Sequence, residues 1–460
     1  MALGPVTGSL AALIASLASY RVPVDVRDYA RIVVFDTIGV LAAASHPSVT
    51  SASRIGVFAE THGGAGPATL VGRNRKVDVV SAVLANGTLG YAIDFEPHHP
   101  EAVLHPAAVV VPVALALSEA YRKSGTEMIT AVILGCEVAY RVSMALDPRE
   151  LYALGFHPSA VAGVFGASAT SACLLELDKE ACVRALGLAA LQASGLLAWQ
   201  DDPCEDARPF QMGMAARNGV TAALLAGQGF GAPDRVFDGG HTVLRAFSRS
   251  ADPAPLTDQL GESWNGIIEL AIKPYPCVSF LHPALDALEK LLAREQIHPD
   301  EIESMDLRFA DSGAHCVDDN PLKGHCAQYI LPVRAATGRL TFLDLFEDLR
   351  GSNPGVARLA AVTTVTRDRG DFDEIFPNFY ACEVTLRLSD GRKLTERRDI
   401  ARGYPQAPLS DEDITDKFRS VVSSVADTER VERLSNAAWD LGDAANVLSL
   451  TALLGKEPAA

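Results

Sequence analysis

The chain has 460 residues, of which 48% are hydrophobic and 21% are charged, so it can build a large core and two domains are the natural expectation. Its formal net charge of -17 makes nucleic acid an unsuitable partner, because an acidic surface repels phosphate backbones. No uncharged apolar run reaches the roughly 18 residues of a membrane span, which leads us to expect a cytoplasmic protein without a membrane partner.

The eight cysteines lie mostly in apolar stretches and include no CxxC pair. This pattern is typical of reduced core residues in a reducing compartment, and it lacks the spacing of a zinc site, so no metal is expected. The Ala/Leu-rich run of residues 9–18 has no basic region before it. It therefore predicts an amphipathic first helix and not a signal peptide.

The first half of the chain is predicted to be helical, because apolar residues recur there at helical spacing. The predicted helices are residues 26–44, 79–89, 107–120, 127–146, 160–177 and 213–227. Several are apolar nearly all round, which indicates helices buried inside a bundle. Gly163, Gly166 and Ala167 share one helical face, where they permit a close approach of neighbouring helices.

The pattern changes near Glu262 to one that mixes strands with helices. Alternating apolar residues predict strands around residues 305–309 and 384–388, and the Asp390–Gly391 turn signal joins the latter to a strand over 393–400. A further strand is predicted over 359–366, and helices over 283–294 and 322–336. A capped helical pattern returns at Ser410, so the tail is expected to rejoin the first domain.

One loop concentrates residues that can carry chemistry. Residues 94–105 hold Asp94, Glu96, His98, His99 and His105, and the three prolines at 97, 100 and 106 keep the flanking helices from fusing. Loops held by rigid helices are where catalytic groups concentrate. The structural alternative is that these histidines cap helices or bond the backbone. Neither an HxH nor an HExxH pattern occurs, so a metal is not expected here either.

Three further segments carry candidate residues. His157 directly precedes a small-residue helix, Lys273 follows an apolar run and precedes a Pro-x-Pro turn, and Arg208 stands at the start of a helix. Taken singly, each has an ordinary structural alternative, such as a solvated lysine or an N-terminal helix residue. The glycine clusters at 63–66 and 227–231 do not form a strand–GxGxxG–helix unit and are interpreted as turns.

Taken in order, these segments resemble the MmgE/PrpD family over essentially the whole chain. Residues 92–106 resemble its "DFDDTH…HP" loop, 156–166 its "FHP" segment, and 208–219 its "KPFQ" segment. Residues 273–286 resemble its "K.YP…H…D" segment, and 403–418 its "PLS" segment. The family includes 2-methylcitrate dehydratase, cis-aconitate decarboxylase and iminodisuccinate epimerase.

The resemblance implies a mainly α protein with a smaller α+β domain. A large helical domain would be built from residues 1–264 and 405–460, and an α+β lid domain from residues 265–404. It also implies a homodimer, a small anionic polycarboxylate as substrate, and no cofactor. The positions that match family catalytic residues are Asp94, His105, His157, Lys273 and Tyr329, and those expected to bind substrate are His98, His99, Arg208 and His282.

Four positions depart from the family pattern. Glu96 and Pro97 replace two acidic residues of the loop motif, His98 replaces its threonine, and Arg208 replaces the lysine before "PFQ". Val278 stands where the decarboxylase branch has a histidine. These departures weaken the case for the decarboxylase activity and for 2-methylcitrate as substrate.

The chemistry implied is proton abstraction next to a carboxylate, which builds charge beside an existing anion. Lys273 and Arg208 are suited to neutralise that charge, and a histidine is suited to take the proton at neutral pH. We therefore expect a cofactor-independent lyase of the dehydratase type. The alternatives are an epimerase or isomerase of an iminodisuccinate-like dicarboxylate, and a non-catalytic relative that has kept only the fold.

Overall fold

The computed structural model describes residues 4–16, 22–201, 204, 206–376 and 379–456. The chain divides into two compact units: residues 1–92, 96–270 and 411–460 form the helical unit, and residues 93–95 and 271–410 form the α+β unit. The expected fold class, mainly α with a smaller α+β part, is confirmed. The domain limits at 264/265 and 404/405 stay predictions, and the fold is described here by the two units.

The helical unit is a bundle of buried helices with one small hairpin. Its elements are α1 (Pro5–Ser16), α2 (Val24–Ala44), α3 (Thr50–His62), β1 (Ala65–Thr69), β2 (Lys76–Val77), α4 (Val79–Leu89), α5 (Pro106–Tyr121), α6 (Gly125–Ala145), α7 (Pro148–Ala153), α8 (Pro158–Leu174), α9 (Lys179–Ala190), α10 (Ala207–Gly227), α11 (Val243–Phe247), α12 (Asn265–Ile268), α19 (Asp411–Val422), α20 (Thr428–Trp439) and α21 (Leu448–Leu454). The helices predicted from apolar spacing are all present, with ends shifted by a few residues, and α10 starts six residues earlier than the prediction. Residues 17 and 18 of the predicted first helix lie outside the described residues.

Small residues let α8 pack tightly between α6 and α10. A Cβ on Gly166 would come within 2.6 Å of the Gly135 carbonyl oxygen of α6, and one on Gly219 of α10 would come within 2.4 Å of the Ala167 Cβ. Any larger side chain at these positions would force the helices apart, so the predicted role of this small-residue face is confirmed.

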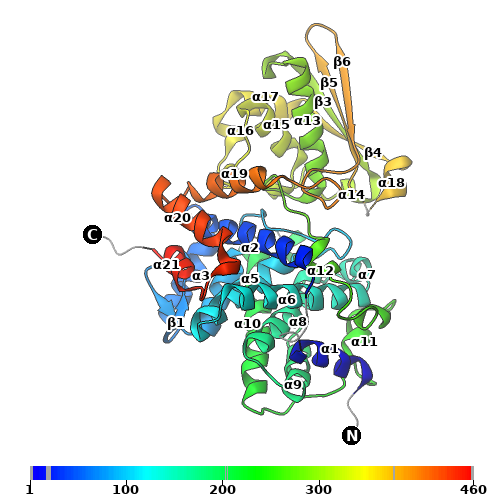
Figure 1. Ribbon diagram of the computed structural model, residues 1–460. Coiled ribbons are helices and arrows are strands. Elements are labelled where there is room, and N and C mark those ends of the chain that lie inside the picture. The colour runs from blue at the N-terminus through cyan, green and yellow to red at the C-terminus, as the bar shows by residue number, and fades with distance from the viewer. Residues whose placement is uncertain (1–3, 17–21, 202–203, 205, 377–378, 457–460) are drawn as a thin grey trace. The chain divides into compact units, whose positions relative to one another are not determined.

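The last helices pack on α2 of the helical unit (Figure 1). Phe35 and Phe418 stack with ring centroids 4.3 Å apart, and the Lys417 ammonium lies 2.7 Å from the Asp36 carboxylate.

One helix in the described part of the chain, α6, is long and apolar enough to cross a membrane, but 83% of its apolar window is buried inside the protein. The helix also carries the buried Glu137–Arg141 ion pair, so it has the character of a core helix.

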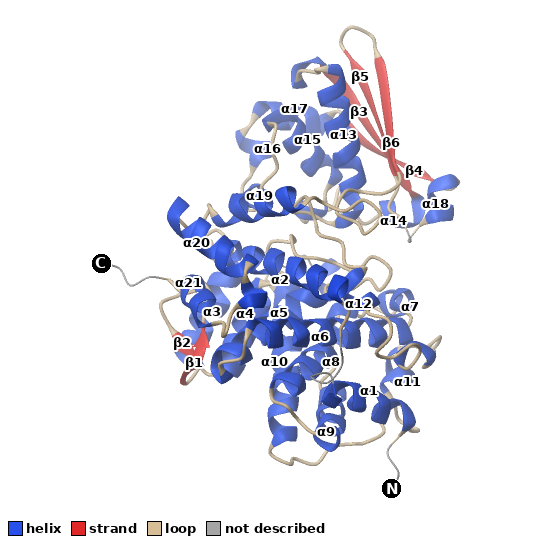
Figure 2. Cartoon of the chain, in the orientation of Figure 1, coloured by secondary structure: helices blue, strands red, loops and turns tan. Residues whose placement is uncertain are grey.

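The α+β unit has a four-stranded sheet with most of its helices on one face (Figure 2). The strands β3 (Ile302–Ala310), β4 (Thr363–Asp368), β5 (Cys382–Leu388) and β6 (Lys393–Arg398) run in the order β4-β3-β5-β6. Only the β3–β4 pair is parallel. The helices are α13 (His282–Glu295), α14 (Asp311–Ala314), α15 (Ala327–Thr337), α16 (Leu349–Ser352), α17 (Pro354–Ala361) and α18 (Asp371–Ile375).

The predicted strand over residues 359–366 is partly wrong. Residues up to Ala361 belong to α17, and the strand β4 begins only at Thr363. The helix forms because the Asn353 side chain accepts hydrogen bonds from the backbone N–H groups of Gly355 and Val356, and Pro354 occupies the first helical position. This capping signal outweighs the β-branched run that follows.

Candidate functional site

The loop between α4 and α5 supplies residues to both units. Residues 93–95 belong to the α+β unit, whereas the residues on either side belong to the helical unit. Asp94 and Val103 have φ angles of 52° and 48°, a left-handed conformation that is costly for residues with a side chain. Such strain persists only where the surroundings enforce it, and it is common at functional sites.

In the helical unit, the buried Glu96 carboxylate pairs with the partly exposed His105 imidazole. The Glu96 side chain has no exposed surface, and its Oε1 lies 2.7 Å from His105 Nδ1. The backbone N–H of His105 donates to Ser159 Oγ at 2.9 Å, which fixes the residue at the start of α5. A carboxylate in this position orients the ring and stabilises the imidazolium that forms when the ring takes a proton.

Tyr91 connects this pair to two other candidate residues, His157 and Arg208. Its ring meets the His105 ring edge-on at 4.9 Å between centroids, and its hydroxyl lies 3.3 Å from His157 Nε2. The guanidinium carbon of Arg208 lies 4.8 Å from the centre of the same ring. The His98 ring lies 5.8 Å from that of His105, so the structure brings together four of the predicted residues.

Arg208 is buried and is not a surface residue. It occupies the second position of α10, as the sequence indicates, and it is only 7% exposed. The Asp206 carboxylate, two residues before it, forms an ion pair with Arg54. A cation in the first turn of a helix is disfavoured by the helix dipole, so this position is well suited to a site that receives an anion.

The contacts of His99 favour a structural role over the substrate-binding role predicted for it. Its Nε2 lies 3.2 Å from the Asn265 carbonyl oxygen, its Nδ1 accepts from the Ala102 N–H, and its ring stacks on Tyr140 at 4.7 Å. Burial lowers its pKa to about 4, which keeps the ring neutral. Both ring nitrogens are thus committed to the loop's own backbone and to α12.

The α+β unit holds a second cluster formed by Asp94, Lys273 and His325. The Lys273 ammonium lies 2.5 Å from Asp94 Oδ1 and 3.1 Å from the Asp94 carbonyl oxygen. The other carboxylate oxygen of Asp94 lies 3.5 Å from His325 Nε2. Lys273 is therefore not the solvated lysine of the structural alternative: it is 1% exposed and paired.

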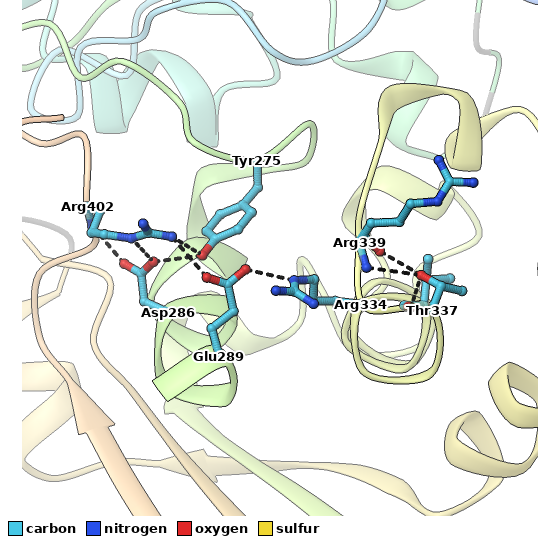
Figure 3. A network of polar contacts seen from close by, with 8 residues as sticks. Tyr275, Asp286, Glu289, Arg334, Thr337, Arg339 and Arg402 are labelled. Carbon is cyan, nitrogen blue, oxygen red and sulfur yellow. Dashed lines mark hydrogen bonds and ion pairs between the residues drawn. The ribbon is translucent and has the colours of Figure 1, made fainter. Parts of the chain in front are cut away.

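A polar network holds the segment that carries Lys273 (Figure 3). The Tyr275 hydroxyl donates to Asp286 at 2.9 Å and accepts from Arg402 at 2.7 Å, while Arg402 also binds Asp286 through its side chain and its backbone N–H. The network continues through Glu289 to Arg334. Next to it, the Ile272 N–H donates to the Gly403 carbonyl oxygen at 2.8 Å.

Gly403 permits this contact because it has no side chain and can adopt a positive φ. It adopts a φ of 88°, and a Cβ there would come within 1.9 Å of the Ile272 carbonyl oxygen. The backbone on either side of Lys273 is thus fixed by contacts to distant parts of the same unit.

The structure gives Tyr329 and His282 contacts with the backbone of the α+β unit. The buried Tyr329 hydroxyl lies 2.6 Å from the Asp344 carbonyl oxygen and 2.9 Å from that of Glu347, either of which can accept its proton, and burial raises its pKa to about 12. His282 is fully buried, with Nε2 3.2 Å from the Cys277 carbonyl oxygen. These contacts favour structural roles over the catalytic and substrate-binding roles predicted for them.

Three residues of the two clusters were not among the predicted site residues: Tyr91, Glu96 and His325. Glu96 belongs to the loop that concentrates chemical groups, but its position departs from the family motif. Tyr91 lies three residues before Asp94, and His325 lies four residues before Tyr329, so nearness in sequence to a candidate residue is the signal that could have found them. Among the described residues, no group of three or more His, Cys, Asp or Glu side chains could hold a metal ion.

Comparison with known proteins places both halves of the chain in one family. Residues 8–256 match the family model of the MmgE/PrpD N-terminal domain, and residues 275–441 match that of the MmgE/PrpD C-terminal domain. The cis-aconitate decarboxylase-like protein oryM of Aspergillus oryzae is 28% identical over 99% of this chain and 98% of its own.

Two further relatives carry the name cis-aconitate decarboxylase. The protein from Aspergillus terreus strain NIH 2624 is 27% identical over 98% of this chain and 96% of its own. The protein from Homo sapiens is 28% identical over 81% of this chain and 79% of its own. The chain therefore belongs to the MmgE/PrpD family and is an enzyme of the lyase type.

Proposed function

We propose that the protein is a cofactor-independent lyase that acts next to a carboxylate of a small di- or tricarboxylic acid. The observation that carries this proposal is the pair of His105 with the buried Glu96 carboxylate, which lies in one unit with the buried cation of Arg208. The names of the relatives support a lyase on a substrate of this class, and the departures at Glu96, Pro97 and His98 leave the particular acid open.

The arrangement suits both reactions that a lyase of this kind performs. In a dehydration, a base removes the proton next to the carboxylate and the hydroxyl leaves as water. In a decarboxylation, carbon dioxide leaves and the carbon takes up a proton. Each reaction passes through a state with negative charge beside a carboxylate, which a nearby cation stabilises, and each needs a group that moves a proton at neutral pH. His105 is suited to that transfer, and Arg208 to holding a carboxylate with two hydrogen bonds.

A panel of polycarboxylates incubated in deuterated water tests the proposal. The panel contains cis-aconitate, 2-methylcitrate, citrate and iminodisuccinate, and proton NMR follows alkene formation, loss of carboxylate and deuterium incorporation. We expect loss of water or carbon dioxide from at least one acid. Deuterium incorporation without either loss would instead establish the epimerase alternative, and binding without any turnover would establish the non-catalytic one.

A pair of variants connects the activity to the site. His105→Asn should abolish turnover, because it removes the imidazole beside Glu96. The exposed His241, which lies in the same unit, provides the matched control His241→Asn. Near wild-type turnover by His105→Asn would refute the site. The same proposal includes a homodimer in the cytoplasm. Light scattering of the purified protein measures its mass and so tests the dimer.

A further inference from the structure

Tyr91 is the residue around which the cluster of the helical unit is arranged. It is 4% exposed, and its side chain contacts His105, His157 and Arg208. His157 additionally lies 6.2 Å from the Trp199 ring. The Tyr91 hydroxyl lies beside the His157 imidazole, and the Tyr91 ring meets the His105 imidazole. A phenol hydroxyl in such surroundings can transfer a proton, and the hydrogen bonds of the two imidazoles decide in which direction.

The hydrogen bonds of His157 fix its tautomer. The backbone N–H of Ser159 donates to His157 Nδ1 at 3.2 Å, so this nitrogen carries the lone pair. The ring proton of neutral His157 is therefore on Nε2, from which it donates to the Tyr91 oxygen at 3.3 Å. A second proton on Nδ1 would point at the Ser159 N–H. His157 is thus held neutral as a donor, and it cannot serve as the base.

His105 has the opposite tautomer. Its Nδ1 lies 2.7 Å from the Glu96 carboxylate, which can only accept, so Nδ1 carries the proton. The lone pair of neutral His105 is then on Nε2, and Glu96 stabilises the ring after it takes a proton. The two histidines therefore have different roles: His105 accepts a proton, and His157 donates a hydrogen bond.

We propose that Tyr91 is a further catalytic residue, the proton donor of the reaction, with His157 holding its oxygen; this rests on the proposed lyase function. In a dehydration, His105 Nε2 takes the proton next to the carboxylate, and the electron pair of that C–H bond forms the double bond. The Tyr91 O–H bond breaks, its proton joins the departing hydroxyl to form water, and its electron pair stays on the Tyr91 oxygen. The imidazolium of His105 then returns its proton to the Tyr91 oxygen, so the cycle closes without another reactant.

The same donor serves a decarboxylation. The electron pair of the broken C–C bond stays on the carbon, which takes the proton of Tyr91. A water molecule then gives a proton to the phenolate and leaves as hydroxide. Two neighbours stabilise the phenolate in either reaction: the His157 Nε2–H donates to its oxygen, and the Arg208 cation lies 4.8 Å from the ring centre.

Tyr91→Phe tests the donor role, because it keeps the ring against His105 and Arg208 but removes the hydroxyl. We expect kcat to fall by about 100-fold or more with little change in KM, as for loss of a general acid. In deuterated water the variant should still exchange the hydrogen next to the carboxylate, since His105 remains. Tyr29→Phe, which removes a partly buried hydroxyl elsewhere in the same unit, is the control and should keep its activity.

Two kinetic outcomes would overturn the proposal. A kcat near that of the wild type would show that the hydroxyl is dispensable. Equal loss of exchange and of product would show that Tyr91 only positions His105.

A measurement that needs no substrate separates this proposal from the proposed function. Nitrogen-15 NMR of histidine-labelled protein should show the proton on Nδ1 of His105 and on Nε2 of His157, with each signal assigned by its His→Gln variant. The proton on Nδ1 of His157 would overturn the proposal even in an active enzyme. A wild-type enzyme that turns over none of the acids, but has the expected tautomers, would refute the proposed function and leave the assignment of the two rings standing.

Discussion

Removing Lys273 should destabilise the α+β unit far more than removing an ordinary lysine. The Lys273 and Asp94 side chains are 1% and 4% exposed, and their charges meet at 2.5 Å. Lys273→Met keeps the length of the side chain but leaves the Asp94 carboxylate buried without its cation. Breaking a buried pair in this way costs about 3–5 kcal/mol of unfolding free energy. For a unit of this size that corresponds to a Tm lower by roughly 6–20 °C.

The double variant Lys273→Met/Asp94→Asn isolates the cause. It removes both charges, and asparagine tolerates the left-handed backbone at position 94, where φ is 52°. We therefore expect the double variant to recover most of the lost stability, although neither variant should turn over substrate. Lys290→Met is the matched control in the same unit, because Lys290 pairs with Glu396 at a site where its side chain is 45% exposed. Such an exposed pair contributes at most about 1 kcal/mol.

Differential scanning calorimetry of the four proteins measures the effect directly. A Tm of Lys273→Met within about 2 °C of the wild type would refute the buried pair, because a shift that small corresponds to about 1 kcal/mol or less. A double variant as unstable as the single one would also refute the reasoning, since the loss would then come from packing and not from the uncompensated carboxylate.

Two further predictions concern the helical unit. Arg208→Lys should raise KM with a smaller effect on kcat, and Arg208→Ala should impair both, because only the guanidinium binds a carboxylate with two hydrogen bonds. Steady-state kinetics measures both variants, with Arg217→Ala at an exposed position of α10 as the control. An unchanged kcat/KM in Arg208→Ala would refute this prediction. The pKa of His99 is about 4 in the folded protein and about 6.5 in the unfolded chain, so the unfolded chain binds one more proton between these pH values. The free energy of unfolding should therefore fall by about 3 kcal/mol as the pH drops from 6.5 to 4. Denaturant unfolding at several pH values measures how the free energy of unfolding depends on pH. In this range the dependence should correspond to one proton fewer in His99→Gln than in the wild type, and equal dependences would contradict the buried neutral ring.

The local patterns of the sequence predicted most elements of the fold. Periodicity located the buried helices because their apolar residues face neighbours on nearly every side, and alternation located β3 because Met305, Leu307 and Phe309 all point into the core. The strand over 359–366 was partly wrong because a capping residue, Asn353, acts from outside the apolar run. End positions shifted elsewhere for the same kind of reason, since caps and prolines set them.

The sequence also located the groups of the candidate site but not their partners. Six carboxylate and imidazole groups stand within twelve residues of the loop, so their nearness in sequence could not tell which carboxylate meets which imidazole. The fold separates them: Glu96 meets His105, Asp94 turns to the α+β unit, and His99 bonds the backbone. The partner of Asp94 is Lys273, 179 residues away, and no local pattern joins two such positions.

The sequence by itself determined the fold class, the family and the kinds of side chain from which the chemistry must come, because these depend on local periodicity and on the order of short motifs. Only the tertiary structure decided which nitrogen of each histidine carries its proton. That choice depends on the Glu96 carboxylate beside His105 Nδ1 and on the hydrogen bonds that Ser159 donates to His157 and His157 donates to Tyr91, groups that folding brings together. A histidine in a sequence can be base, donor or structural residue, and the atoms packed around its two nitrogens distinguish these roles.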